Sequence, residues 1–245
     1  MGTATKRETG CKDEVFAPVD RQPVGGVRIK DRDACWTVTG IDPLAVPLSA
    51  FAARFKAVTP NRLTSLSVAI ALGAAALFAT GQLVAGAIVY QLAFLVDCMD
   101  GKVASIRDMK SEWGGFFDVA GDTVRYVACF TPLAVVSLSG DATTWALLAA
   151  LLYPCARFGL LSMAGARPAG GSRGDMLVEP RPLTVLKLAP RRATKPGTTV
   201  DAELVALTLG PLTGYPLEGF AVAAGLHLLH TAVLFAGSVR AATEP

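Results

Sequence analysis

The chain has 245 residues, of which 52% are hydrophobic and 18% charged, with a formal net charge of +3 and a mean hydropathy of +0.45. Soluble domains of this length carry more charge, and their apolar residues seldom form runs long enough to cross a bilayer. The composition therefore excludes an ordinary soluble domain and indicates a membrane protein. Five scattered cysteines without a CxxC pair argue against a disulfide framework or zinc site. No aromatic-basic interleaving occurs, so no nucleic-acid partner is expected.

The first part of the chain is polar. Residues 1–42 are mixed in charge and contain Gly25 and Gly26, which predicts a weakly structured cytosolic arm. Residues 43–58, PLAVPLSAFAARFKAV, then alternate apolar faces with Arg54 and Lys56. This pattern fits an amphipathic helix on the membrane surface better than a span. No basic segment leads directly into an apolar run with a small-residue cleavage site, so no secretory signal peptide is expected.

Six apolar stretches follow. They predict six transmembrane helices, at about residues 61–80, 83–100, 113–138, 143–163, 202–213 and 217–239. The fifth is short, and Gly210-Pro211 interrupts its end. The charged segment 102–112 must lie outside the hydrocarbon. The predicted fold class is therefore all-α, a polytopic protein with one membrane domain over residues 43–240.

The basic residues of the connections predict an orientation. TGQ, SLSGDATT and TGYPLEG contain no Lys or Arg, whereas the N-terminal arm, the connection 102–112, the loop 167–195 and the tail contain nearly all of them. The two sets alternate along the chain, so the positive-inside rule places both termini and the connection 102–112 in the cytoplasm. We expect a multi-pass protein of the cell membrane, with the basic loop 167–195 attracted to the lipid surface.

Four aspartates lie at the edges of the second and third predicted spans. Asp97 and Asp100 are three residues apart and Asp118 and Asp122 four, so each pair shares a helix face. The hairpin between these spans can bring the pairs together, where four carboxylates would not all ionise unaided. Two divalent cations would neutralise them, and oxygen ligands favour Mg²⁺ or Mn²⁺. The sequence predicts a two-metal site for phosphoryl displacement, with solvated carboxylates at helix ends as the alternative.

The order of these residues resembles the signature of the CDP-alcohol phosphotransferase (phosphatidyltransferase) family. The matching motifs are Pro60-Asn61-x2-Thr64, Asp97-x2-Asp100-Gly101-x2-Ala104 and Gly114-x3-Asp118-x3-Asp122. The resemblance extends over about residues 44–240 and is sharp in the motifs alone. It implies transfer of a phospho-alcohol group from a CDP-alcohol donor to an acceptor hydroxyl, with release of CMP, in phospholipid biosynthesis. It also implies a homodimer. A degenerate, non-catalytic member and an intramembrane prenyltransferase are the alternatives.

The resemblance also implies residue roles. Asp97 would bridge two metal ions, and Asp100 and Asp118 would complete their coordination. Asp122 would touch a metal and take the proton of the acceptor hydroxyl. The positions expected to hold the nucleotide donor are Asn61, Arg62, Gly101, Ser105 and Ser111. The structural alternatives are helix packing for Gly101 and Gly114, and capping of the third span for Ser111.

Ser105 departs from the signature, which has an arginine at that position. Arg107 or Lys102 could approach the same donor charge, although neither points in the same helical direction. The donor is therefore bound differently or is an unusual CDP-alcohol, and CDP-diacylglycerol is the default expectation.

Arg125 and Arg157 fall inside predicted spans, where an arginine needs a partner. We expect Arg125 to pair with an aspartate of the third span. Arg157 either contacts backbone carbonyls or lipid phosphate, or binds the phosphate of an acceptor. Inositol phosphate and glycerol phosphate are the leading acceptors, because the cytosolic face is rich in arginine. His227 and His230 are predicted to pack rather than to bind a metal.

Overall fold

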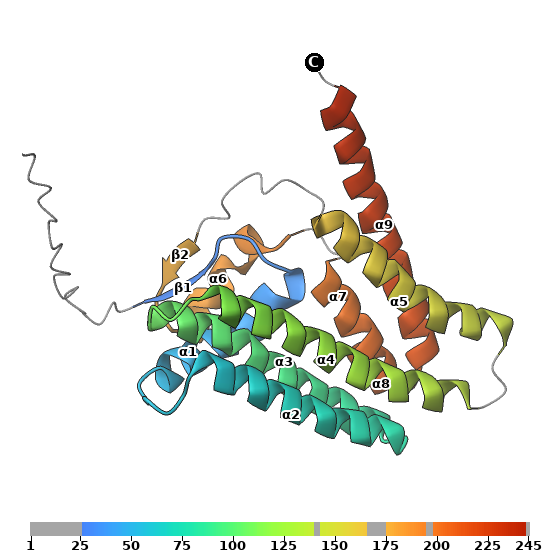
Figure 1. Cartoon of the computed structure of the whole chain (residues 1–245), viewed down its shortest axis with the longest axis horizontal. Helices are drawn as coiled ribbons and strands as arrows, with labels where there is room; N and C mark the ends of the chain where they lie inside the picture. The colour runs from blue at the N-terminus through green and yellow to red at the C-terminus, as the bar shows by residue number, and fades with distance from the viewer. Residues whose placement is uncertain (1–25, 140–142, 166–174, 195–197, 244–245) are drawn as a thin grey trace, which may run out of the picture.

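The structure is a computed structural model of the whole chain, and it describes residues 26–139, 143–165, 175–194 and 198–243 (Figure 1). Nearly all of this regular structure is helical. In chain order the elements are β1 (Val27–Lys30), the π-helix η1 (Thr37–Ile41), α1 (Asp42–Ala52), α2 (Pro60–Ala79), α3 (Leu83–Ile106), α4 (Glu112–Leu138), α5 (Thr144–Gly165), β2 (Asp175–Val178), α6 (Pro182–Arg192), α7 (Thr199–Leu204), the π-helix η2 (Val205–Leu209), α8 (Gly210–Thr213) and α9 (Pro216–Thr243).

Helix α2 packs against both α3 and α4, and the four aspartates are carried by α3 and α4 (Figure 1). Pro60 suits the first turn of α2, and the Thr59 hydroxyl caps it by accepting a hydrogen bond from the Arg62 N–H at 3.4 Å. Gly81, with a φ of 74°, makes the turn that returns the chain along α3. The Ser111 hydroxyl accepts a hydrogen bond from the Gly114 N–H at 3.0 Å at the start of α4. This confirms the predicted cap.

Helices α5 and α9 pack along each other, and α9 also contacts η2 and α8 (Figure 1). Between them Tyr153 stacks on Phe220 and on His227, with ring centroids 5.8 Å and 5.6 Å apart. His227 is fully buried in this stack, which is the packing role predicted for it. The apolar core is thus continuous from α2 to α9.

Four helices of the described chain are long and apolar enough to cross a membrane: Pro60–Ala79, Leu83–Ile106, Glu112–Leu138 and Pro216–Gly237. By length and apolar composition, four of the six predicted spans are therefore confirmed, and the protein is a membrane protein. The apolar segment Thr144–Phe158 of α5 is shorter. The fifth predicted span is built from α7, η2 and α8 in succession, and the chain stays helical through Gly210-Pro211 as far as Thr213. The 15 residues from Thr199 to Thr213 rise about 22 Å along the helix axis, less than the hydrocarbon thickness of about 30 Å.

A small cap of β1, β2, α1 and α6 lies at one end of the helices (Figure 1). Strands β1 and β2 pair antiparallel, with Val27 opposite Val178. Val27 and Ile29 point inward and are buried with Val46 of α1, because alternate residues of a strand face opposite sides. The prediction of a weakly structured arm is therefore wrong for residues 26–42, while residues 1–25 lie outside the described chain. Likewise, the polar stretch 167–195 contains β2 and α6.

Two predicted helix boundaries need correction. The helix predicted for residues 43–58 ends at Ala52 and is preceded by η1, so residues 53–59 belong to no helix. Helix α3 continues to Ile106, six residues beyond its predicted end. Its last turns pack against α1, and Lys102, predicted to lie in a charged connection, contacts the buried Asp42 with 2.9 Å between Nζ and Oδ1.

Candidate active site and metal centre

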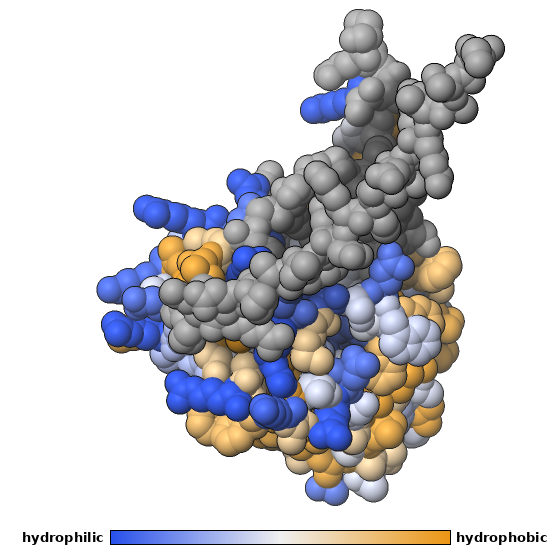
Figure 2. Space-filling view, turned by 60° about the vertical axis from the view of Figure 1, so that its left-hand side comes forward, coloured by the Kyte–Doolittle hydropathy of each residue, from blue (hydrophilic) through white to orange (hydrophobic). Residues whose placement is uncertain are grey.

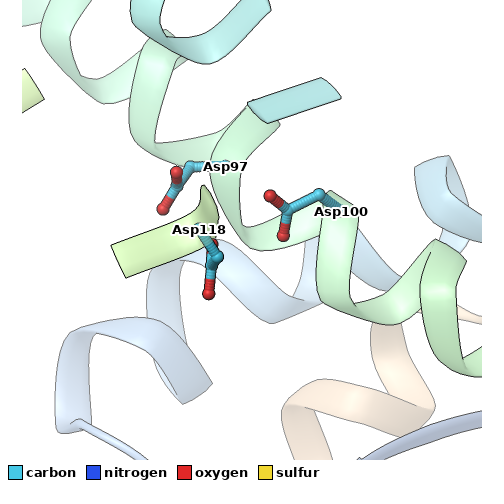
Figure 3. Close-up of side chains that lie close together, drawn as sticks. All are labelled: Asp97, Asp100 and Asp118. Atoms are coloured by element: carbon cyan, nitrogen blue, oxygen red, sulfur yellow. The ribbon is translucent and has the colours of Figure 1, made fainter. Parts of the chain in front are cut away.

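Three of the four predicted aspartates converge. Asp97 and Asp100 extend from α3 and Asp118 from α4, and Figure 3 shows the three side chains around one small space. A carboxylate oxygen from each lies within 4.8 Å of those of the other two. Asp97 and Asp100 are buried, and Asp118 is half-buried. The helical spacing of three predicted for the first pair is what places both on the α4 side of α3.

Two hydroxyl groups of α2 orient the buried carboxylates. Thr64 donates a short hydrogen bond to Oδ2 of Asp100, and Ser67 donates to Oδ1 of Asp97 at 3.2 Å. Both hydroxyl residues are buried. Because they are three residues apart, Thr64 and Ser67 share the face of α2 that meets α3 and α4. The side chains of α2 thus fix how the carboxylates of α3 are turned.

Asp122 lines the same space but lies outside the group of three. Its carboxylate contacts the guanidinium of Arg125 one turn further along α4, and its side chain is 45% exposed. The predicted pairing of Arg125 with an aspartate of the third span is confirmed. Arg125 also lies 3.6 Å from Oδ2 of Asp97, so it connects Asp122 to the buried group.

A buried network continues from Arg125 to Arg157. Arg125 Nη1 donates to the Tyr90 hydroxyl at 3.0 Å, and that hydroxyl donates to Oε2 of Glu203 at 3.0 Å. Arg157 donates to Oε1 of Glu203 from Nη2 at 2.7 Å and from Nε at 3.1 Å. Its guanidinium also covers the Tyr126 ring, 4.0 Å from the centroid. Arg157 therefore has a protein carboxylate as its partner, rather than the backbone carbonyls named as one expectation.

A cavity of about 370 Å³ opens over the aspartates. Of the predicted site residues, those that line it are Asp97, Asp100, Gly101, Ser105, Asp118 and Asp122. Part of its wall comes from the cap and includes Arg28 and Lys30 of β1. Asn61, Arg62, Ser111 and Arg157 are not among the described residues that line it.

The remaining predicted donor residues gather where α2 and α4 begin. A Cβ at Gly114 would lie 3.1 Å from the Ser111 hydroxyl and 3.9 Å from the Asn61 side-chain oxygen, so these three positions are neighbours. Arg62 is exposed and donates to the Ala57 carbonyl at 2.7 Å. Nothing lies within 4 Å of a Cβ placed at Gly101, so this glycine leaves open space beside the cavity.

Of the two basic residues near Ser105, Lys102 lines the cavity, and Arg107 is not among the described residues that do so. Arg107 donates hydrogen bonds to the backbone carbonyls of Phe55 and Val58. Lys102 pairs with Asp42 and also donates to the Cys98 carbonyl at 2.9 Å. Both cations are therefore used to hold the cap and the connection between α1 and α2.

The sequence reasoning missed three groups of this site. Ser67 and Glu203 each lie within predicted spans, and an ionisable side chain in a span needs a buried partner. That rule would have singled out Glu203, whereas nothing in the sequence distinguishes Ser67 from the exposed Ser65 of the same span. The cations of β1 carried no such signal, because Arg28 and Lys30 reach the site only through the packing of the cap.

The residues fit divalent cations. The three converging aspartates supply oxygen ligands alone, which hard cations such as Mg²⁺ and Mn²⁺ prefer. The charged groups of this buried region, within the described chain, are Asp97, Asp100, Asp118, Asp122, Glu203, Arg125 and Arg157. Other basic residues, among them Arg28, Lys30 and Lys110, also line the cavity. Without them, five carboxylates face two guanidinium groups, which is an excess of negative charge. A bound dication would offset that excess.

Comparisons with known proteins point to one family. A sequence profile of the family described as CDP-alcohol phosphatidyltransferase matches residues 57–189. A relative from Rubrobacter xylanophilus, named bifunctional IPC transferase and DIPP synthase, is 33% identical over 159 residues. These residues make up 65% of this chain and 32% of the relative, so the chain spans about a third of that relative's length.

Crystal structures of phosphatidylinositol phosphate synthase (PgsA1) from Mycobacterium tuberculosis have a similar fold. The apo form has a TM-score of 0.52 at 22% identity, over 77% of this chain and 93% of that chain. The form with CDP-DAG bound has a TM-score of 0.52 at 21% identity, over 78% and 92%. The complex with manganese and citrate has a TM-score of 0.52 at 20% identity, over 78% and 87%.

The family profile covers more than half of the chain and includes all four aspartates and both hydroxyl groups that orient them. The similarity to the solved structures supports the same arrangement of helices. The chain belongs to the CDP-alcohol phosphatidyltransferase family, whose members are transferases.

Proposed function

We propose that this protein transfers a phosphatidyl group from CDP-diacylglycerol to a hydroxyl group of a polar acceptor, with release of CMP, in phospholipid biosynthesis. The observation that carries the proposal is the convergence of Asp97, Asp100 and Asp118 on a cavity large enough for a substrate headgroup. The structure of the mycobacterial relative with CDP-DAG bound supports the choice of donor. The acceptor is inositol phosphate or glycerol phosphate.

Asp97, Asp100 and Asp118 would hold the metal, as two Mg²⁺ or Mn²⁺ ions, with Asp122 as a further ligand. Such ions supply positive charge that stabilises the pyrophosphate and the departing CMP. Thr64 and Ser67 keep the buried carboxylates turned towards the cavity. Their role is positioning, because hydrogen bonds to ligating carboxylates fix the orientation of those ligands.

Asp122 is the proposed general base. Its side chain is nearly half exposed at the cavity, so an acceptor hydroxyl can reach it. The hydroxyl oxygen forms a bond to the phosphorus next to the lipid alcohol, the bond from that phosphorus to the CMP oxygen breaks, and the hydroxyl proton passes to Asp122. Arg125, which contacts the same carboxylate, holds it in place before the acceptor arrives.

The nucleotide side of the donor would lie over Gly101 and Ser105, towards the starts of α2 and α4. There Asn61 and Ser111 are neighbours, and Arg62 is exposed one residue along. The N–H groups at the start of a helix favour a phosphate oxygen, which supports a donor role for Ser111. Arg157 stays a predicted acceptor residue, and its use in binding would require exchange of its contact with Glu203.

We propose six spans in the cell membrane, with both termini and the cavity on the cytoplasmic side, and a homodimer. Figure 2 shows many hydrophilic side chains on the left and in the centre of the view and hydrophobic side chains over much of its lower and right-hand parts. Helix α1 exposes Leu44, Leu48 and Phe51, at spacings of four and three, while Ala45 and Val46 are buried. This arrangement supports a surface position for α1, with one face on lipid and the other on the protein.

The proposed function is tested by CMP release in detergent from the full chain, using CDP-diacylglycerol and a panel of alcohols. Release should require a divalent cation, stop with EDTA and be abolished by Asp100→Asn. Asp108→Asn is the matched control, because this aspartate lies in the α3–α4 connection with a φ of 53°, a conformation that asparagine also adopts. No CMP release with any alcohol, or equal loss in both variants, would reject the proposal.

A further inference from the structure

Strand β1 forms a wall of the aspartate cavity, although it precedes the region that the family profile matches. The strand alternates buried and exposed residues. Val27 and Ile29 pack into the core of the cap, which leaves Arg28 and Lys30 together on the other face. Both of these basic residues line the cavity that the four aspartates line. The cap therefore brings two cations to the site from outside the family region.

Three other cations near the site have a carboxylate partner, and a fourth, Lys110, also lines the cavity. Lys102 and Arg192 both contact Asp42, at 2.9 Å and 2.8 Å, and Arg157 contacts Glu203 at 2.7 Å. Arg157 pairs with Glu203, and Lys102 and Arg192 share the single carboxylate of Asp42, so a substrate would have to compete with these carboxylates for all three cations. They are poor candidates for binding an anionic group.

The two cations of β1 differ from these. Arg28 is exposed, and its side chain has no ion pair or hydrogen bond with any of the residues that the structure describes. Lys30 has a long contact of 4.0 Å to Asp33, with its side chain 60% exposed. A long ion pair at an exposed position contributes little and exchanges readily. Both side chains are therefore free to bind an anion that enters the cavity.

A buried ion triad fixes the position of this wall. Asp42 at the start of α1 is 1% exposed and contacts Lys102 of α3 and Arg192 of α6. Arg192 is also buried, and its Nε donates to the Lys30 carbonyl at 2.9 Å. The strand is thus tied through Arg192 and Asp42 to the helix that carries Asp97 and Asp100. The cations of β1 are held at a fixed place relative to the aspartates.

We propose that Arg28 and Lys30 bind a phosphate group of the substrate inside the cavity that the aspartates also line. Alternate residues of a strand are about 7 Å apart, so two long basic side chains can close on one phosphate. An arginine also offers paired N–H donors that match phosphate oxygens. The group is either the phosphate of a phosphorylated alcohol acceptor or the pyrophosphate of the donor. This inference rests on the proposed function in assigning the cavity to these substrates.

The test uses the double variant Arg28→Gln/Lys30→Gln in the full chain, with Lys187→Gln/Arg191→Gln as the control. The control removes the same charge from α6 of the same cap, at two exposed residues that do not line the cavity. We expect the KM for inositol phosphate to rise about tenfold in the double variant, because two charge-assisted contacts are lost. The KM for unphosphorylated inositol and the kcat should stay within about twofold of the unaltered protein.

The other outcomes are distinct. A rise in the KM for CDP-diacylglycerol in place of the acceptor identifies the donor pyrophosphate as the bound group and supports the proposal. Three results would overturn the proposal. The KM could rise equally for phosphorylated and unphosphorylated inositol, or it could rise equally in the control variant because both variants bind the lipid surface less well. The third is no change in any KM. If the unaltered protein releases no CMP, the proposed function fails, and thermal shifts with inositol phosphate in EDTA then decide. A thermal shift that the unaltered protein and the control variant show and the double variant lacks supports a phosphate site. No thermal shift in the unaltered protein overturns the proposal.

Discussion

Arg157 of α5 and Glu203 of α7 form a buried ion pair, with 2.7 Å between Nη2 of the arginine and Oε1 of the glutamate. Through Oε2 the same carboxylate accepts a hydrogen bond from Tyr90 and lies 3.8 Å from Arg125. Glu203 is thus placed between the two arginines predicted inside the membrane. Its negative charge offsets the positive charges of both arginines, and it links the aspartate site to α5.

Replacing Glu203 should therefore destabilise the protein. Glu203→Gln leaves two buried guanidinium groups with less negative charge, and we expect a loss of about 3 kcal/mol in the free energy of unfolding. Equilibrium unfolding in detergent measures it. A double-mutant cycle that combines Glu203→Gln with Arg157→Gln should give a coupling energy of about 1 kcal/mol or more. Additive effects would contradict a direct pairing. A KM change for phosphorylated acceptors in Arg157→Lys, at unchanged stability, would support the predicted acceptor role.

The hydroxyl groups of α2 should control metal affinity. Thr64→Val and Ser67→Ala each remove a hydrogen bond to a buried carboxylate, so the carboxylate is less well oriented. We expect each change to weaken Mn²⁺ binding roughly 10–100-fold, measured by calorimetry or by the metal dependence of CMP release. Ser65→Ala is the control, because its exposed hydroxyl donates only to the Asn61 carbonyl of its own helix. A control that weakens metal binding as much would point to a general effect on α2.

Gly121 should be necessary for the approach of α4 to α2. A Cβ at this position would lie 2.8 Å from Cγ2 of Thr64, whose hydroxyl holds Asp100. Gly121→Ala should therefore lower the free energy of unfolding by about 1–3 kcal/mol and weaken metal binding. Gly115→Ala, on the same helix with nothing within 4 Å, should instead add roughly 0.5–1 kcal/mol through helix propensity. Unfolding curves of both variants make the comparison, and similar effects would contradict the close contact.

Asp122→Asn should separate turnover from binding. The amide keeps the size of the side chain but cannot accept the acceptor proton at neutral pH, so we expect CMP release to fall at least about a hundredfold. Binding of CDP-diacylglycerol, followed by thermal shift or filter binding, should stay largely intact. Full activity in this variant would remove Asp122 as the base. Loss of nucleotide binding as well would make it chiefly a ligand.

The buried triad of the cap should contribute strongly to stability. Asp42→Asn leaves Lys102 and Arg192 without their shared carboxylate, and we expect a loss of about 3 kcal/mol. Proteolysis of the cap at low protease concentration provides a second readout, because β1 and α6 should open first. Asp31→Asn, at an exposed position of the same segment, is the control. An Asp42→Asn protein as stable and as resistant as this control would show that the triad does not hold the cap.

The sequence determined the membrane character, the helices that carry the site and the identity of the converging aspartates. Those features are local: a run of about 20 apolar residues specifies a membrane helix, and spacings of three and four specify a shared face. The N-cap at Ser111 and the ion pair of Arg125 with Asp122 depend on neighbours three residues away, so they too could be predicted.

Only the tertiary structure decided which distant groups complete the site. Thr64 and Asp100 are 36 residues apart, Arg157 and Glu203 46, and Arg192 donates to a carbonyl 162 residues earlier. Such partners follow from how helices and the cap pack, which periodicity along the chain does not encode. The same packing separates Asp122 from the other three aspartates and turns part of the polar N-terminal region into a wall of the cavity.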